Sequence, residues 1–183
     1  ASQVVSVNGT YSFVIYDDAG NSTTKTITVS NIDKTAPTGN LGQTPTSWTN
    51  GNVTLNLTSI ADVGSGVKNI KLPNGTIVTG TSASQVVSVN GTYSFVITDN
   101  AENSTTKTII VSNIEEIAPT GTLVQTPTGA TNGDVTLNLT SIADTGGSGY
   151  YRTKLPNGSF VTTTTASETV SANGTYSFVI YDN

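Results

Sequence analysis

The side chains best suited to chemistry in this 183-residue chain are carboxylates that recur at a fixed spacing. Asp33, Asp62 and Asp99 are each followed 82 or 83 positions later by another acidic residue, and these are Glu115, Asp144 and Asp182. Carboxylate oxygens are the hard ligands that Ca²⁺ prefers, and this ion tolerates irregular geometry. A pair of carboxylates is also the machinery of glycoside hydrolysis. Two kinds of chemistry are therefore open to these carboxylates, calcium binding and glycosidase catalysis.

The composition removes most other chemistry. The chain has no His and no Cys, so it cannot build a Ser-His-Asp or Cys-His nucleophile, an imidazole or thiolate zinc site, or a common haem site. Only twelve Asp and Glu are present, and most recur at equivalent positions, which does not favour a dedicated catalytic pair. We therefore expect no enzyme activity and no required cofactor, with calcium as the one option.

Charge and hydropathy limit the partners. Seven Lys and Arg are scattered along a chain of net charge −5, which argues against nucleic acid. No apolar run approaches the length of a membrane span. The same absence of Cys excludes a disulfide framework, so each domain must be held by packing alone.

The elements that position these carboxylates are predicted to be strands. Thr (35), Ser (20) and Asn (18) dominate a chain in which only 10% of residues are charged and 34% are apolar. Thr, Val, Ile and Tyr favour strands, and long runs of helix formers are missing. The composition predicts an all-β protein.

An internal repeat organises the chain. The string ASQVVSVNGTYSFVI begins at Ala1 and again at Ala83, and a variant of it begins at Ala166, so the repeat period is 82 or 83 positions. Boundaries are predicted at the two Ala-Pro linkers, because Pro stiffens the chain and opens a new extended segment. These boundaries define a first repeat segment (1–33), a middle segment (34–115) and a last segment (116–183).

Alternating apolar residues predict about seven short strands in the middle segment. The expected ranges are 41–46, 53–57, 67–72, 76–78, 85–89, 93–97 and 107–111. Seven short strands in roughly 80 residues are typical of an immunoglobulin-like sandwich. The first segment would hold the last three strands of such a module (E, F and G), and the last segment would lack its final strand.

A repeated Asn-Gly-Thr-Tyr-Ser-Phe string indicates a structural corner. In immunoglobulin domains a Tyr at the start of strand F hydrogen-bonds back across the preceding corner, two residues before a Cys. Here Phe stands at the Cys position, and the alternative is that both aromatic residues are ordinary core residues. The structural candidates are Tyr11, Tyr93, Tyr176, Phe13, Phe95 and Phe178.

The strings DKTAPTG, TNGNVTLNLTSIADVGSGVKNIKLPNG and NGTYSFVITDNAENSTTKTIIVSNI resemble the tandem bacterial Ig-like repeats of large cell-surface and adhesin-type proteins, over the whole chain. The resemblance implies tandem immunoglobulin-like β-sandwich modules of about 82 residues, with incomplete terminal modules. It also implies an extracellular location, at a bacterial surface or secreted.

The calcium hypothesis depends on this fold. In an Ig-like sandwich the start of strand A, the B–C loop and the F–G loop meet at one end, so Asp33, Asp62 and Asp99 would converge, as would their equivalents in the last segment. The Asp-x-x-Ala-Pro linker is similar in kind to the calcium-binding linkers of cadherins. The alternative is that Asp and Asn only form turns through side-chain bonds to the backbone.

These observations favour a non-catalytic extracellular repeat protein that forms a stalk, fibre or filament segment. Its partners would be neighbouring modules or copies of the same protein, and the incomplete ends suggest completion by neighbouring copies. The alternatives are an adhesin or carbohydrate-binding array with a host or glycan ligand, or accessory domains of a secreted hydrolase.

The Thr162–Thr165 run is short, and the preference of Thr for strands accounts for it.

Overall fold

We describe a computed structural model that covers residues 1–183. The chain is all-β, with strands arranged in five small sheets. It contains no helix with the length and apolarity needed to cross a membrane. Contacts along the chain define two compact units: unit 1 comprises residues 1–42, 55–85 and 92–109, and unit 2 comprises residues 43–54, 86–91 and 110–183.

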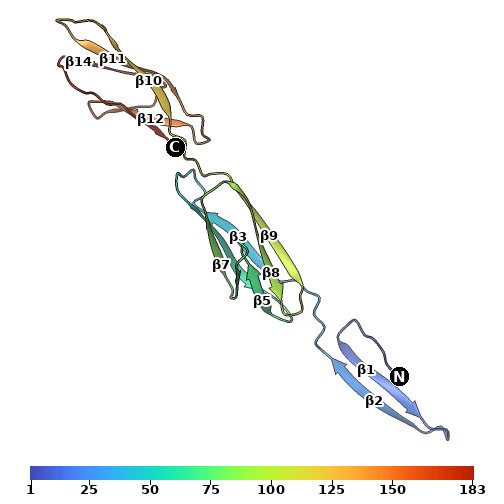
Figure 1. Ribbon diagram of the computed structural model, residues 1–183. Coiled ribbons are helices and arrows are strands. Elements are labelled where there is room, and N and C mark those ends of the chain that lie inside the picture. Colours follow the sequence, from blue (N-terminus) through green and yellow to red (C-terminus); the bar gives the residue numbers. More distant parts are fainter. The chain divides into compact units, whose positions relative to one another are not determined.

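Unit 1 begins with a hairpin. Strands β1 (Gly9–Tyr16) and β2 (Ser22–Val29) form an antiparallel hairpin (Figure 1). Gly9 lies opposite Val29 in this pair. The turn between them is held by the Asp17 side chain, which accepts bonds from the Ala19 and Asn21 amides. Short polar side chains that bond the backbone in this way are the usual means of fixing a tight loop.

The middle segment forms two sheets, most of whose residues belong to unit 1, while residues 43–54, 86–91 and 110–111 belong to unit 2. One has the order β3-β4-β7, and the other has the order β6-β5-β8-β9. The strands are β3 (Thr38–Thr44), β4 (Val53–Ala61), β5 (Val67–Lys71), β6 (Ile77–Val78), β7 (Ala83–Val87), β8 (Gly91–Asp99) and β9 (Ser104–Val111).

The alternation expected of half-buried strands is present in these two sheets. Leu55 and Leu57 of β4, Ile70 of β5, and Phe95 and Ile97 of β8 are fully buried, while their neighbours along each strand are more exposed. A face of large apolar side chains on each sheet is the pattern of a sandwich-like fold, in which the two inner faces share one core.

Unit 2 contains the sheets of the last segment. Its two three-stranded sheets have the orders β10-β11-β14 and β13-β12-β15. The strands are β10 (Thr120–Thr126), β11 (Val135–Ala143), β12 (Tyr150–Lys154), β13 (Phe160–Val161), β14 (Ala166–Val170) and β15 (Val179–Asp182). In Figure 1 β10, β11 and β14 form one layer and β12 lies in the other. Leu137, Leu139, Ile142 and Leu155 are buried in this part.

One predicted strand is absent. The sequence predicts strand E before the first hairpin of the first segment, but residues 1–7 do not form a strand and Val4 is 97% exposed. The same five residues, ASQVV, form β7 at Ala83–Val87, where β4 lies beside them in the sheet. The first segment contains no counterpart of β4, so residues 1–7 have no strand to pair with.

The first strand of the middle segment also differs from expectation. It begins at Thr38 rather than Leu41, and it ends at Thr44. Gly39 is buried, and a side chain there would lie 3.1 Å from the Ile97 side chain. The apolar pattern did not indicate this part of the strand, because the residue that faces the core is a glycine.

Candidate functional site

The structure brings together one of the two predicted acidic trios. Each of Asp33, Asp62 and Asp99 offers a carboxylate oxygen within 4.8 Å of the others. Asp99 is fully buried, and the other two are half-buried. They come from the linker before β3, the β4–β5 loop and the end of β8. Three carboxylates at this separation have the chemistry of a calcium ligand set.

A glycine in the β4–β5 loop allows the contact with Asp33. Asp33 accepts hydrogen bonds from the Thr35 amide at 2.9 Å and the Ser65 amide at 2.7 Å. A Cβ on Gly64 would lie 2.6 Å from the Asp33 carboxylate, and Gly64 has a φ of 147°. Any side chain at Gly64 would therefore displace Asp33 and strain the backbone.

These donors explain the acidity of Asp33. The Thr35 amide, followed by the hydroxyl and amide of Ser65, holds the pKa of the Asp33 carboxyl below its ordinary value of 3.8, because each donor stabilises the ionised form. Asp33 is therefore a carboxylate at neutral pH.

Asp62 carries the one unsatisfied oxygen of the trio. Its Oδ2 atom accepts a bond from the Gly66 amide at 2.8 Å, while its Oδ1 atom is buried and has no hydrogen-bond partner. A buried acceptor without a donor is costly. Asp62 Oδ1 is the atom of the trio for which a cation would have the largest effect.

Asp99 organises the β8–β9 loop. Its Oδ1 atom accepts bonds from the Ala101 and Asn103 amides, and its Oδ2 atom accepts one from Asn103 Nδ2. Asn103 also donates to the carbonyls of Asp33 and Thr35. The turn-forming interpretation of Asp99 is thus realised in the structure, and Asn103 links this loop to the segment before β3.

The second trio does not converge in the way the sequence predicted. Glu115 accepts bonds from the Ile117 amide and from Ser148 Oγ, and Asp144 accepts bonds from the Gly146 and Gly149 amides. Asp182 lies on β15 and does not join these two as a three-carboxylate cluster. Glu115 is one methylene longer than Asp33, and the β11–β12 loop has one residue more than the β4–β5 loop. The loop therefore closes around Glu115 through different contacts.

Tyr11 and Tyr176 make the bond expected of a corner. The Tyr11 hydroxyl donates to the Val7 carbonyl at 2.7 Å, and the Tyr176 hydroxyl donates to the Ala172 carbonyl at 2.9 Å. Tyr93 and Phe95 both lie on β8, where Tyr93 is half-buried and Phe95 is completely buried. Phe13 is 38% exposed on β1, and Phe178 is half-buried.

The Asn residues that open the repeated Asn-Gly-Thr-Tyr-Ser-Phe string have a role that the string itself does not indicate. Asn90 Nδ2 donates to the Ile114 carbonyl at 2.8 Å, and the Ile114 amide donates to Asn90 Oδ1 at 3.0 Å. Asn8 and Ile32 make the same pair of bonds, each at 2.9 Å. The equal spacing of Asn8 to Ile32 and Asn90 to Ile114 was the available signal. We call this reciprocal pair the asparagine clasp.

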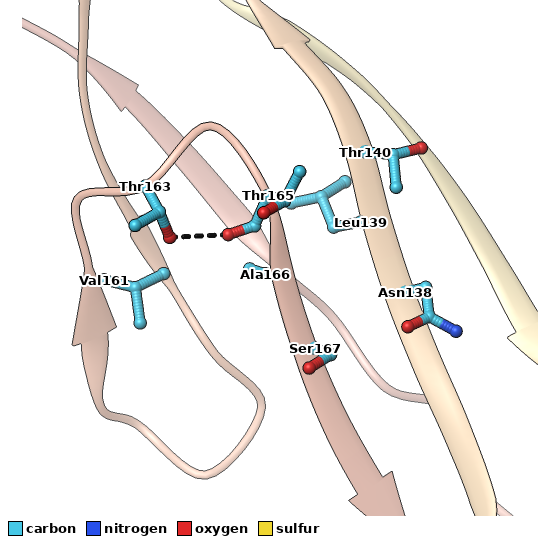
Figure 2. A pocket seen from close by; sticks show the side chains of 8 residues that line it. All are labelled: Asn138, Leu139, Thr140, Val161, Thr163, Thr165, Ala166 and Ser167. Carbon is cyan, nitrogen blue, oxygen red and sulfur yellow. Dashed lines mark hydrogen bonds between the residues drawn. The ribbon is translucent and has the colours of Figure 1, made fainter.

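An open hollow of about 360 Å³ lies between strands of the last segment. Figure 2 shows its lining, with the Thr163 hydroxyl donating to the Thr165 carbonyl at 2.6 Å. The residues around it are Asn138, Leu139, Thr140, Val161, Thr163, Thr165, Ala166 and Ser167. These side chains provide hydroxyl, amide and apolar groups, which can form hydrogen bonds with a ligand. None of the lining residues is acidic or basic, so none of them could activate a hydroxyl group.

Comparison with known proteins gives no family assignment. No protein-family model matches the chain, and no curated protein matches it in sequence. The repeat and the bonds described above are therefore the basis for inferring a function.

Proposed function

We propose that this chain is part of a non-catalytic extracellular repeat protein, in which tandem immunoglobulin-like sandwiches, each one repeat period long, form a stalk, fibre or filament at a bacterial surface. Its partners are neighbouring modules and copies of the same protein. The observation that carries the proposal is that the same hydrogen bonds from side chains to the backbone recur at the repeat spacing.

The strand order supports an immunoglobulin-like topology. In the middle segment the orders β3-β4-β7 and β6-β5-β8-β9 correspond to strands A-B-E and C′-C-F-G of such a sandwich. The last segment repeats the A-B-E order as β10-β11-β14 and the C′-C-F order as β13-β12-β15. The tyrosine corners at Tyr11 and Tyr176 belong to the same fold type.

The recurring bonds support a structural role. The asparagine clasp occurs at Asn8 and Asn90, and the bonds of Asp17 to the Asn21 amide and Nδ2 recur between Asp99 and Asn103. These bonds fasten loops and strand ends, which are the places where a sandwich begins to open. Repeat proteins in which each module is held in the same way have nearly additive stability along the chain.

Protease treatment of intact cells of the source organism tests the location. Antibodies against the 183-residue chain should label intact cells or the culture medium, and brief external protease should remove the cell-bound signal. A cytosolic protein in the same cells serves as the control and should remain intact. Labelling that appears only after lysis would contradict the proposal.

A further inference from the structure

The outer face of sheet β13-β12-β15 carries an unusual group of side chains. Tyr151, Arg152 and Lys154 come from β12, Phe160 comes from β13 and Tyr181 comes from β15. Thr153, between Arg152 and Lys154, is completely buried, so its two neighbours project to the other side of the strand. We call these five residues the arginine–aromatic face.

Arg152 is the only arginine in the chain, and three rings surround it. Its guanidinium carbon lies 4.2 Å from the centre of the Phe160 ring, 5.0 Å from that of Tyr151 and 5.4 Å from that of Tyr181. Rings at such distances attract a cation through their negative faces. A bulge at Tyr151 brings its ring to the same side as Arg152, since Tyr150 pairs with Asp182 and Arg152 pairs with Tyr181.

No acceptor in the protein uses the donors of Arg152. Its Nε atom is buried and has no hydrogen-bond partner, and the only salt bridge in the chain joins Lys68 to Glu102. A guanidinium has five N–H donors in a planar fork that matches a carboxylate. The rings hold this fork in place, but they leave its hydrogen bonds unmade.

The middle segment lacks this face, although its backbone is equivalent. The positions of Tyr151, Arg152, Phe160 and Tyr181 are occupied there by Lys68, Asn69, Ile77 and Thr98. Lys68 stands at the same bulge, between the pairs Val67–Asp99 and Asn69–Thr98, and is neutralised by Glu102. The fold therefore does not require the arginine–aromatic face.

The exposed rings point to the class of ligand. Tyr151 is 49% exposed, Phe160 48% and Tyr181 37%, so each offers part of a ring face to solvent on this sheet. The negative face of an aromatic ring attracts polarised C–H groups, which a pyranose ring presents on its flat side. Arg152 and the exposed Lys154 add two positive charges with no acidic partner. A sugar ring that bears a carboxylate could stack on the aromatic rings and accept hydrogen bonds from the guanidinium at the same time.

We infer that the arginine–aromatic face binds acidic glycans, with sugar rings stacked on Tyr151, Phe160 or Tyr181 and a carboxylate bonded to Arg152. This is a binding activity beyond the structural role proposed above, and it is confined to the last segment. The carboxylate accepts hydrogen bonds from the terminal Nη groups of Arg152, which bond to no acceptor within the protein, and Lys154 contributes attraction at the edge.

The first experiment uses the intact 183-residue chain on an array of uronate-containing, sialate-containing, sulfated and neutral glycans. We expect carboxylated glycans to be retained, and their neutral counterparts of equal length to be bound about tenfold more weakly or worse, since a charge-assisted bond is lost. Retention of no carboxylated glycan, equal retention of neutral ones, or a preference for sulfated ones would overturn the inference.

The middle segment supplies the matched variants. Replacing the face with its counterparts (Y151K, R152N, F160I and Y181T) should abolish glycan binding and leave the far-UV circular dichroism spectrum unchanged. Arg152→Asn alone should weaken binding about tenfold or more, and it provides the same test if the fourfold variant fails to fold. The converse replacement, K68Y, N69R, I77F and T98Y, should add a second binding site in calorimetry. Undiminished binding by a folded Arg152→Asn chain would overturn the inference.

Discussion

Short polar side chains fix the loops of this protein by bonding to the backbone. Asp17 and Asp99 each accept two backbone amides and one asparagine side chain, and they do so in loops with the same spacing. Asp33 and Asp62 cap the β4–β5 loop in a related way. The main role of these acidic side chains is therefore to hold the loops through hydrogen bonds. Any ion would bind to carboxylate oxygens that the loops already hold in place.

Acidification tests this fastening at Asp17. The Asn21 side-chain amide, followed by the Asn21 backbone amide, lowers the pKa of Asp17 below 3.8. A carboxyl whose folded-state pKa is depressed stabilises the fold above its unfolded pKa, and that contribution is lost as the pH falls through the folded pKa. We expect the β1–β2 turn to loosen below about pH 4, as measured by NMR of the Asp17 carboxyl and the Asn21 amide.

A substitution makes the measurement specific. Asn21→Ala removes the largest cause, so the pKa of Asp17 should rise toward 3.8. Thr24→Ala, on the exposed strand β2, should leave it unchanged. An Asp17 pKa that is the same in the wild type and in Asn21→Ala would show that the turn bond does not form in solution.

At the element scale, the asparagine clasp joins the turn before β8 to the chain beyond β9. Asn90→Ala leaves the amide and carbonyl of Ile114 without their partners, and Ile114 is only 8% exposed. Unsatisfied buried groups cost about 1–3 kcal/mol each. We expect a loss of stability of that order in urea, and faster hydrogen exchange at the Ile114 amide.

The first hairpin provides the matched control for this element. Asn8→Ala removes the same two bonds from an exposed site, where water replaces them. Its effect on the urea midpoint should be much smaller. Equal effects of the two substitutions would mean that burial of Ile114 does not govern the strength of the clasp.

Three loops meet at the acidic trio, and calcium would link them. Because an ion that binds only the folded state stabilises it by mass action, about 2.7 kcal/mol at a free concentration 100 times Kd, we expect millimolar Ca²⁺ to raise the melting temperature of the chain. Asp62→Asn should remove the shift, since Asp62 Oδ1 is the unsatisfied oxygen. Asp134→Asn, at an exposed position outside the trio, should retain it.

An unchanged melting temperature in wild-type protein with Ca²⁺ and with chelator would reject the calcium hypothesis. The trio would then act only through its hydrogen bonds to the loops. Retention of the shift in Asp62→Asn would place the ion elsewhere.

The sequence predicted most elements because apolar alternation is strong in strands such as β4 and β8. It predicted the strand at residues 1–7 wrongly, since the same letters fold as a strand only where β4 is beside them. Of the site, the convergence of Asp33, Asp62 and Asp99 followed from their places in the predicted sandwich, at the start of strand A and in the B–C and F–G loops. The roles of Gly64 and of the arginine–aromatic face did not, because they depend on a close approach and on a bulge that sequence patterns do not reveal.

Over the whole molecule, the two proposed functions depend on different residues. The structural role depends on residues that recur at the repeat spacing, and glycan binding depends on residues that do not recur. Residues that recur at the repeat spacing, such as Asn8 and Asn90, fasten the fold. The residues that depart from it on β12, β13 and β15 gather around Arg152 on one face. A stalk requires the first kind of residue, and glycan recognition requires the second.

Single-molecule stretching of the 183-residue chain tests whether the chain contains a module one repeat period long that resists force. The middle segment, residues 34–115, should open in one step under force. It should lengthen the chain by nearly the extended length of this segment, at most about 3.6 Å for each of its residues. Extension without a force peak, or an increment unrelated to this segment, would contradict the account.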